Sequence, residues 1–381
     1  MTLHDQADRA RPGLFPDFEV LPPGPPIFNP QSGAWLACSY ADVQRVLHEH
    51  TTFSNERPSL TPMDAETGNS SAVMIGMDPP QHRRYRNLLA QAFTPQMVAR
   101  LEPRIRAIAT QLLDDVHGHD QFDIIDDYAA PLAIIIIAEL LGVPAELTLF
   151  RQWTDAFFDL TSSESGKALQ AMGLYFDEVV QQRRQKPQDD LISAMIQAQA
   201  DHETLTDQEI IAHCGLLLFA GNDTTRNLIG NTILCCDAFP GTFQQLQTTS
   251  SLIPSALEEV LRYVPATLTA PRVAKVDTVL GDQTIQAGQW VLPMLTAANR
   301  DPAHFADPTV FDVTRTPNRH LTFGHGVHFC LGAPLARLEA KVAIETLVRR
   351  FQSIQILHDV PLEAVQSPLL YGVKRLPVQV V

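Results

Sequence analysis

Residues 323–332, close to the C-terminus, place one cysteine in a loop punctuated by glycines. A helical pattern follows at once, with Pro334 near its first position, and continues to Arg350. Glycines let such a loop adopt positive φ and approach a flat ligand closely. Free amides and the dipole at the helix start favour a thiolate at Cys330. A lone cysteine beside glycines is more often an ordinary buried thiol. Only the pattern of the whole ten-residue run can therefore indicate a metal-binding thiolate.

The pattern of aromatic, Gly, x, Gly, x, basic, x, Cys, x, Gly is met at every fixed position. It resembles the haem-ligand loop of the cytochrome P450 family, in which a thiolate is the fifth ligand of the iron and favours O–O cleavage. The resemblance implies that Cys330 binds the iron of haem b (iron protoporphyrin IX). It also implies haem contacts from four other members of the run, which are Phe323, Gly324, His328 and Gly332.

The composition fits a large globular chain that does not bind nucleic acid. Of its 381 residues, 45% are hydrophobic, which is enough for a sizeable core. It has 28 lysine and arginine residues against 43 aspartate and glutamate residues, a net charge of −15, which argues against a nucleic-acid partner. The five cysteines form no CxxC pair, and neither a signal peptide nor a membrane anchor is evident. We therefore expect a soluble, monomeric protein with reduced cysteines in the cytoplasm.

Helical periodicity dominates the chain, so we expect one mainly α domain over residues 1–381 with a minor β part and a flexible tail at 1–15. Helices are expected at residues 40–50, 81–92, 95–117, 127–141, 146–160, 167–185, 188–199, 206–238 and 255–263. Strands are expected at residues 272–280, 283–292, 353–357 and 374–380, and a long loop at 54–75. This order is similar to the P450 fold, in which haem lies between the long central helix and the helix after the Cys loop.

The helix expected at 206–238 begins with a capping box and is apolar on most faces, so it should run through the interior. Its run AGNDTT at 220–225 places a carboxylate there, which is costly without a partner or a task. One interpretation is a satisfied polar kink, in which Thr224 bonds to a carbonyl one turn earlier. The run also resembles the oxygen-binding groove of the P450 family. That resemblance implies a local widening at Gly221, a proton donor at Thr224, a proton relay at Asp223 and a haem contact at Ala220.

Glu259 and Arg262 are three residues apart and share a helix face. Alone they would be an ordinary surface pair of little value. In register with the other motifs they resemble the Glu-x-x-Arg pair of the family. The resemblance adds Arg315 and implies a buried network behind the Cys loop.

The two propionates of a haem need cationic donors, although any single candidate could be an ordinary surface cation. The resemblance implies four donors, which are His82, Arg86, Arg272 and His328. Solvent-facing arginines near the Cys loop are also expected to form a basic docking face for an acidic electron-transfer protein, namely Arg83 and Arg84 with Arg86 and Arg337.

The resemblance implies a monooxygenase that inserts one oxygen atom of O₂ into an apolar organic molecule. No flavin or iron–sulfur motif is present, so a ferredoxin or flavodoxin with its NAD(P)H reductase should supply electrons. Alternatives are a peroxygenase, a haem-based sensor and a helical ligand-binding protein, and the Asp223-Thr224 pair argues against the first two. By alignment of motifs, loop 54–75 closes a substrate pocket lined by Leu216, Phe219, Leu268, Thr269, Leu370 and Tyr371.

Overall fold

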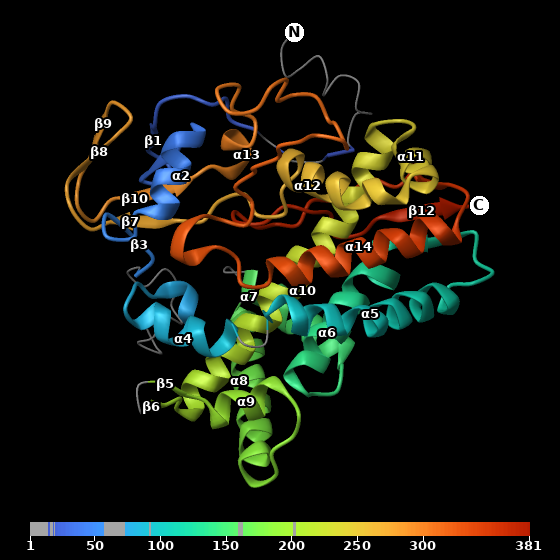
Figure 1. Cartoon of the computed structure of the whole chain (residues 1–381), viewed down its shortest axis with the longest axis horizontal. Helices are drawn as coiled ribbons and strands as arrows, with labels where there is room; N and C mark the ends of the chain where they lie inside the picture. The colour runs from blue at the N-terminus through green and yellow to red at the C-terminus, as the bar shows by residue number, and fades with distance from the viewer. Residues whose placement is uncertain are drawn as a thin grey trace.

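The structure, a computed structural model, describes residues 14–15, 18, 20–56, 73–90, 93–158, 163–200 and 203–381. The larger sheet lies toward one end of the molecule, and helices pack through the rest (Figure 1). This confirms the expected mainly α architecture with a minor β part. No helix in these ranges combines the length and apolar character needed to cross a membrane.

The helices account for most of the described chain. The α-helices are α2 (Tyr40–His48), α4 (Gln81–Ala90), α5 (Pro95–Asp115), α6 (Ala130–Leu141), α7 (Leu147–Phe158), α8 (Ser163–Gln185), α9 (Leu191–Gln197), α10 (Asp207–Ala238), α11 (Thr242–Thr248), α12 (Ile253–Tyr263), α13 (Leu295–Ala298) and α14 (Ala333–Arg350). Short helical turns of other types are η1 (Met74–Gly76), η3 (Ile124–Ala129), η4 (Ser250–Leu252) and η5 (Gly326–His328).

The largest sheet ties the N-terminal segment to the second half of the chain. Its strand order is β1 (Ile27–Asn29), β2 (Ala34–Ala37), β10 (Trp290–Pro293), β7 (Arg272–Ala274) and β3 (Phe53–Ser54). Strand β10 pairs with β2 in parallel, with Trp290 opposite Ala34, whereas the other neighbours are antiparallel. A second sheet has the order β11 (Ile354–Ile356), β12 (Pro377–Val380) and β4 (Gln121–Asp123). Two hairpins are β5 (Gln199–Ala200) with β6 (Glu203–Thr204), and β8 (Thr278–Leu280) with β9 (Gln283–Ile285).

Helix α10 crosses the middle of the molecule beside α6 and α14 (Figure 1). Thr206 and Glu209 form the expected capping box at its start. Gly221 permits the close approach of α6, because a Cβ atom there would lie 3.1 Å from Cδ1 of Ile137. Helix α10 is α-helical from Asp207 to Ala238, so no π-helical turn marks the expected widening at Gly221. This glycine packs against α6.

Several expected boundaries were wrong or lie outside the described residues. Residues 1–13 of the expected tail and 57–72 of the expected loop are not described, but Leu14 is buried in the main core and 74–76 form a helical turn. Each long strand expected at 272–280 and 283–292 is two short strands. Tertiary bonds set the break, because the amide of Gly288 donates to the carbonyl of Ala274 and turns the chain there. The hairpin β8–β9 forms a sheet of its own beyond this point.

Candidate active site

The loop before α14 holds Cys330 between a helical turn, η5, and the helix start. Its amide donates to the carbonyl of Phe323 over 2.8 Å, which closes the loop. Gly326 has a φ of +73°, and a Cβ there would lie 3.0 Å from Cα of His48. The glycine is therefore required where the loop packs against the end of α2.

The surroundings of Cys330 favour negative charge on its sulfur, although burial works in the other direction. Burial raises the pKa of the Cys330 thiol above its usual value. The amides of Gly332 and Ala333 donate to the sulfur, and the charges of Arg86 and Arg337 also favour the thiolate. A metal cation at the sulfur would supply the remaining stabilisation, because thiolate ligands lose their proton on binding.

One face of α10 is open although the helix is otherwise buried between His213 and Cys235. Ala220 is exposed, while Leu216, Gly221 and Thr224 are only half-buried. Leu216, Ala220 and Thr224 follow each other at four-residue intervals, so they share one face. The Thr224 hydroxyl donates to the carbonyl of Ala220 over 2.8 Å, as the sequence predicts. An exposed alanine in the middle of an interior helix marks space for a bound group along this face.

Asp223 points elsewhere and is almost completely buried. Its carboxylate forms an ion pair with Arg226 one turn further along α10, with 2.8 Å between Oδ1 and Nη2. The side chains are 1% and 6% exposed. The carboxylate therefore has a charged partner within its own helix, and it does not face the open side that Thr224 faces.

The four expected propionate donors gather beside the Cys loop. The rings of His82 and His328 lie 4.1 Å apart, and the Nε2 atoms of both are buried without a hydrogen-bond partner among the described residues. Burial lowers the pKa of His82 to about 4 and that of His328 to about 3, and the nearby arginine charges act in the same direction. Among the described residues alone, both rings are therefore neutral near pH 7. Arg86 donates to the carbonyl of Phe329, and Arg272 donates to those of Ala270 and Pro271.

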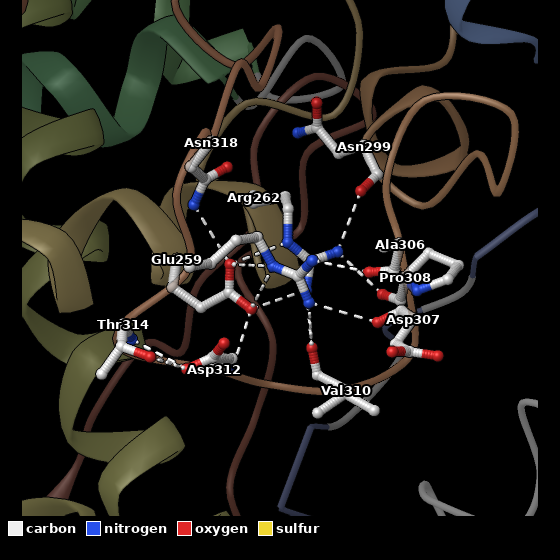
Figure 2. A network of polar contacts seen from close by, with 11 residues as sticks. Glu259, Arg262, Asn299, Ala306, Asp307, Pro308, Val310, Asp312, Thr314 and Asn318 are labelled. Atoms are coloured by element: carbon white, nitrogen blue, oxygen red, sulfur yellow. Dashed lines mark hydrogen bonds and ion pairs between the residues drawn. The ribbon is translucent and has the colours of Figure 1, made fainter.

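Figure 2 shows the network around Glu259. Arg262 meets the carboxylate with two bonds of 2.7 and 2.8 Å, and Arg315 and Asn318 add bonds of 3.1 Å to Oε2. The remaining guanidinium donors reach backbone carbonyls of residues 299–310. The three expected members lie together, and they tie α12 to the irregular segment that leads to the Cys loop.

The expected pocket residues divide into open and buried groups. Leu216 and Leu268 are half-buried, whereas Thr269, Leu370 and Tyr371 are buried. The segment with Leu268 and Thr269 lies beside the segment with Leu370 and Tyr371, since the amide of Leu268 donates to the carbonyl of residue 369. Phe219 is buried on the face of α10 that packs against α8, next to the open face.

The expected docking face is only partly exposed. Arg83 is exposed, but Arg84 is half-buried, and Arg337 forms an ion pair with Glu258 of α12. Sequence reasoning missed this pair, since 79 residues separate its members and no local pattern joins them. It also missed Arg300, a buried guanidinium 4.3 Å from the ring centre of Tyr263, which carries no motif.

Comparison with known proteins agrees with this geometry. The family model described as Cytochrome P450 matches residues 119–379. The chain is similar to Cytochrome P450 109 of Bacillus spizizenii (38% identity, 99% of this chain, 94% of that one) and to the mycinamicin IV hydroxylase/epoxidase of Micromonospora griseorubida (39%, 91% and 89%). Among solved structures, it resembles HmtN, a post-tailoring hydroxylase involved in himastatin biosynthesis (TM-score 0.86, 37% identity, 95% of both chains), and CYP109E1 of Bacillus megaterium in complex with testosterone (TM-score 0.87, 35%, 93% and 94%).

Proposed function

The chain belongs to the cytochrome P450 family and is a haem-thiolate monooxygenase, and from this premise we propose that Cys330 is the iron ligand and that the haem is haem b. The bound haem activates dioxygen for the reaction R–H + O₂ + 2e⁻ + 2H⁺ → R–OH + H₂O. One observation carries the residue assignment: two buried imidazole nitrogens, on His82 and His328, lie beside the Cys loop and have no hydrogen-bond partner in the part of the chain that the structure describes. Buried polar atoms are rarely left unpaired, so these two fit the carboxylates of a propionate-bearing group.

We assign the remaining haem contacts to residues that surround the same space. Arg86 and Arg272 supply positive charge for the propionates, while His82 and His328 donate from their buried Nε2 atoms. Ala220 offers a small side chain on the open face of α10. Close contacts from the Cys loop complete the set, through Phe323, Gly324 and Gly332.

Thr224 and Asp223 are the proposed residues of proton delivery. The Thr224 hydroxyl donates to the carbonyl of Ala220, so the lone pairs of its oxygen remain free to accept a hydrogen bond on the open side. Asp223 faces away and is held by Arg226. A proton therefore passes between the two residues through water or by movement of the Asp223 side chain. The presence of this pair favours a monooxygenase over a peroxygenase.

The proposed substrate is a medium to large, mainly apolar molecule. Leu216 and Leu268 offer open apolar surface, and the buried Thr269, Leu370 and Tyr371 add no charge. Burying a charged group among them would be costly. The relatives support this size class, since one is a mycinamicin IV hydroxylase/epoxidase and another was solved with testosterone.

We propose a ferredoxin or flavodoxin with its NAD(P)H reductase as the electron source, and a monomeric protein. A cytoplasmic location is proposed because all five cysteines are free thiols.

A spectroscopic experiment tests the ligand assignment. The ferrous–CO complex of the protein should show the red-shifted Soret band of a thiolate-bound haem, and the extracted pigment should give the pyridine spectrum of haem b. Cys330→Ser should lose the shifted band, because an alcohol is a poor anionic ligand at neutral pH. Cys214→Ser, at a buried cysteine of α10, is the matched control and should keep the band. An unshifted band in the parent protein would refute thiolate ligation.

A further inference from the structure

Helix α12 carries two adjacent glutamates that bind different arginines. Glu259 belongs to the network of Figure 2, where Arg262 and Arg315 neutralise it. Glu258 faces the Cys loop instead, and it meets Arg337 of α14. The pair of Glu259 and Arg262 belongs to a motif, whereas the pair of Glu258 and Arg337 takes no part in the proposed reaction.

The contact between Glu258 and Arg337 is bidentate. Nε and Nη2 of Arg337 donate to the two carboxylate oxygens over 2.7 and 2.8 Å. His320 Nε2 lies 3.2 Å from the same carboxylate, and the amide of Thr322 donates to its Nδ1. Partial burial alone would raise the pKa of Glu258, but these bonds outweigh it and lower the pKa to about 2. Glu258 is therefore a permanent negative charge, and Arg337 is its charged partner.

Arg337 also reaches the Cys loop. Its guanidinium carbon lies 4.4 Å from the ring centre of Phe323, and the carbonyl of Phe323 accepts the amide of Cys330. The positive charge of Arg337 favours the thiolate form of Cys330. A negative charge beside Arg337 weakens its effect on Cys330. Two opposite charges in contact produce a much smaller electric field at a distant atom than either charge alone.

We propose that Glu258, acting through Arg337, sets the reduction potential of the iron held by Cys330. The inference rests on the proposed ligation by Cys330. Reduction of ferric to ferrous iron adds one electron, so net positive charge nearby raises the potential and net negative charge lowers it. In the ion pair, the positive charge of Arg337 and the negative charge of Glu258 have opposite effects on the potential and largely balance each other.

The sign of the effect differs between the two partners, and this makes the proposal testable. Glu258→Gln leaves Arg337 unbalanced and should shift the midpoint potential to more positive values. Arg337→Gln leaves Glu258 unbalanced and should shift the potential to more negative values. The double variant Glu258→Gln/Arg337→Gln should lie between the single variants, near the parent protein.

Spectroelectrochemical titration of the purified, haem-loaded protein measures these shifts. Glu363→Gln is the matched control, since it makes the same charge change in an exposed ion pair with Lys374, and it should leave the potential unchanged. Arg337→Lys keeps the charge but loses the bidentate contact, so its potential should stay near that of the parent. If Glu258→Gln fails to retain haem, Arg337→Gln still tests the expected direction of the shift in midpoint potential.

The proposal is overturned if the two single variants shift the potential in the same direction. It is also overturned if Glu258→Gln shifts it no more than Glu363→Gln does. The ferrous–CO band separates this failure from that of the proposed function. A thiolate band together with unmoved potentials refutes the role of Glu258 alone, whereas an unshifted band in the parent refutes ligation by Cys330.

Discussion

Thr224 and Thr225 are neighbours with the same side chain, but they face different surroundings. Thr224 lies on the open face of α10, whereas Thr225 is 3% exposed in the interior. Thr224→Ala should keep haem and substrate binding but lower the product formed per NAD(P)H by about tenfold or more, since a positioned proton donor contributes about 10²- to 10⁴-fold. The lost electrons should appear as H₂O₂. Thr225→Ser is the control, and an unchanged ratio in Thr224→Ala would remove this residue from proton delivery.

Asp223 is expected to govern the rate of proton delivery. Asp223→Asn removes the acid while it preserves the shape of the side chain, so turnover should fall by about 10- to 100-fold and the solvent isotope effect should rise. Arg226→Lys retains the opposite charge beside Asp223 and should lose far less activity. Haem content and thermal unfolding show whether each variant is folded. Equal turnover of Asp223→Asn and the parent would contradict the relay.

At the scale of elements, the Glu259 network fastens α12 to the segment before the Cys loop. The side chains of Glu259 and Arg262 are both 0% exposed. Arg262→Met removes the bidentate partner of a buried carboxylate and should lower the free energy of unfolding by about 3–5 kcal/mol. Lys374→Met, in the exposed pair with Glu363, should cost less than about 1 kcal/mol. Urea unfolding measures both, and similar small losses would mean that the network contributes little to stability.

Elements governed by local signals were predictable from the sequence. The capping box of Thr206 and Glu209 fixed the start of α10 within one residue. The i, i+3 spacing of Glu259 and Arg262 placed them on one helix face, although only the family resemblance implied a buried pair. The break between β7 and β8 was not predictable, because it depends on a bond from Gly288 to Ala274. Contacts between distant segments, such as Glu258 with Arg337, leave no periodic trace in the sequence.

At the scale of the whole molecule, a resemblance in four short motifs identified a fold that covers nearly the whole chain. The candidate site draws on α4, α10, α12, β7 and the Cys loop, which are far apart in sequence. Motif spacing predicted which residues gather there. It could not predict that the pKa values of His82 and His328 are lowered, because this shift depends on burial that only the assembled fold provides.

The net charge of −15 repels an acidic electron-transfer protein, so docking of that protein depends strongly on a local basic face. Arg83 is exposed on α4, the helix whose Arg86 bonds to the carbonyl of Phe329 beside Cys330. Arg337 contributes less than expected, because Glu258 neutralises it.

Reduction by a ferredoxin should slow as ionic strength rises, since salt screens exposed charges. Arg83→Glu should slow it further at low salt. Arg349→Glu, at the far end of α14, should have little effect. Stopped-flow reduction under CO measures these rates, and rates indifferent to salt and to Arg83→Glu would place the docking site on another face.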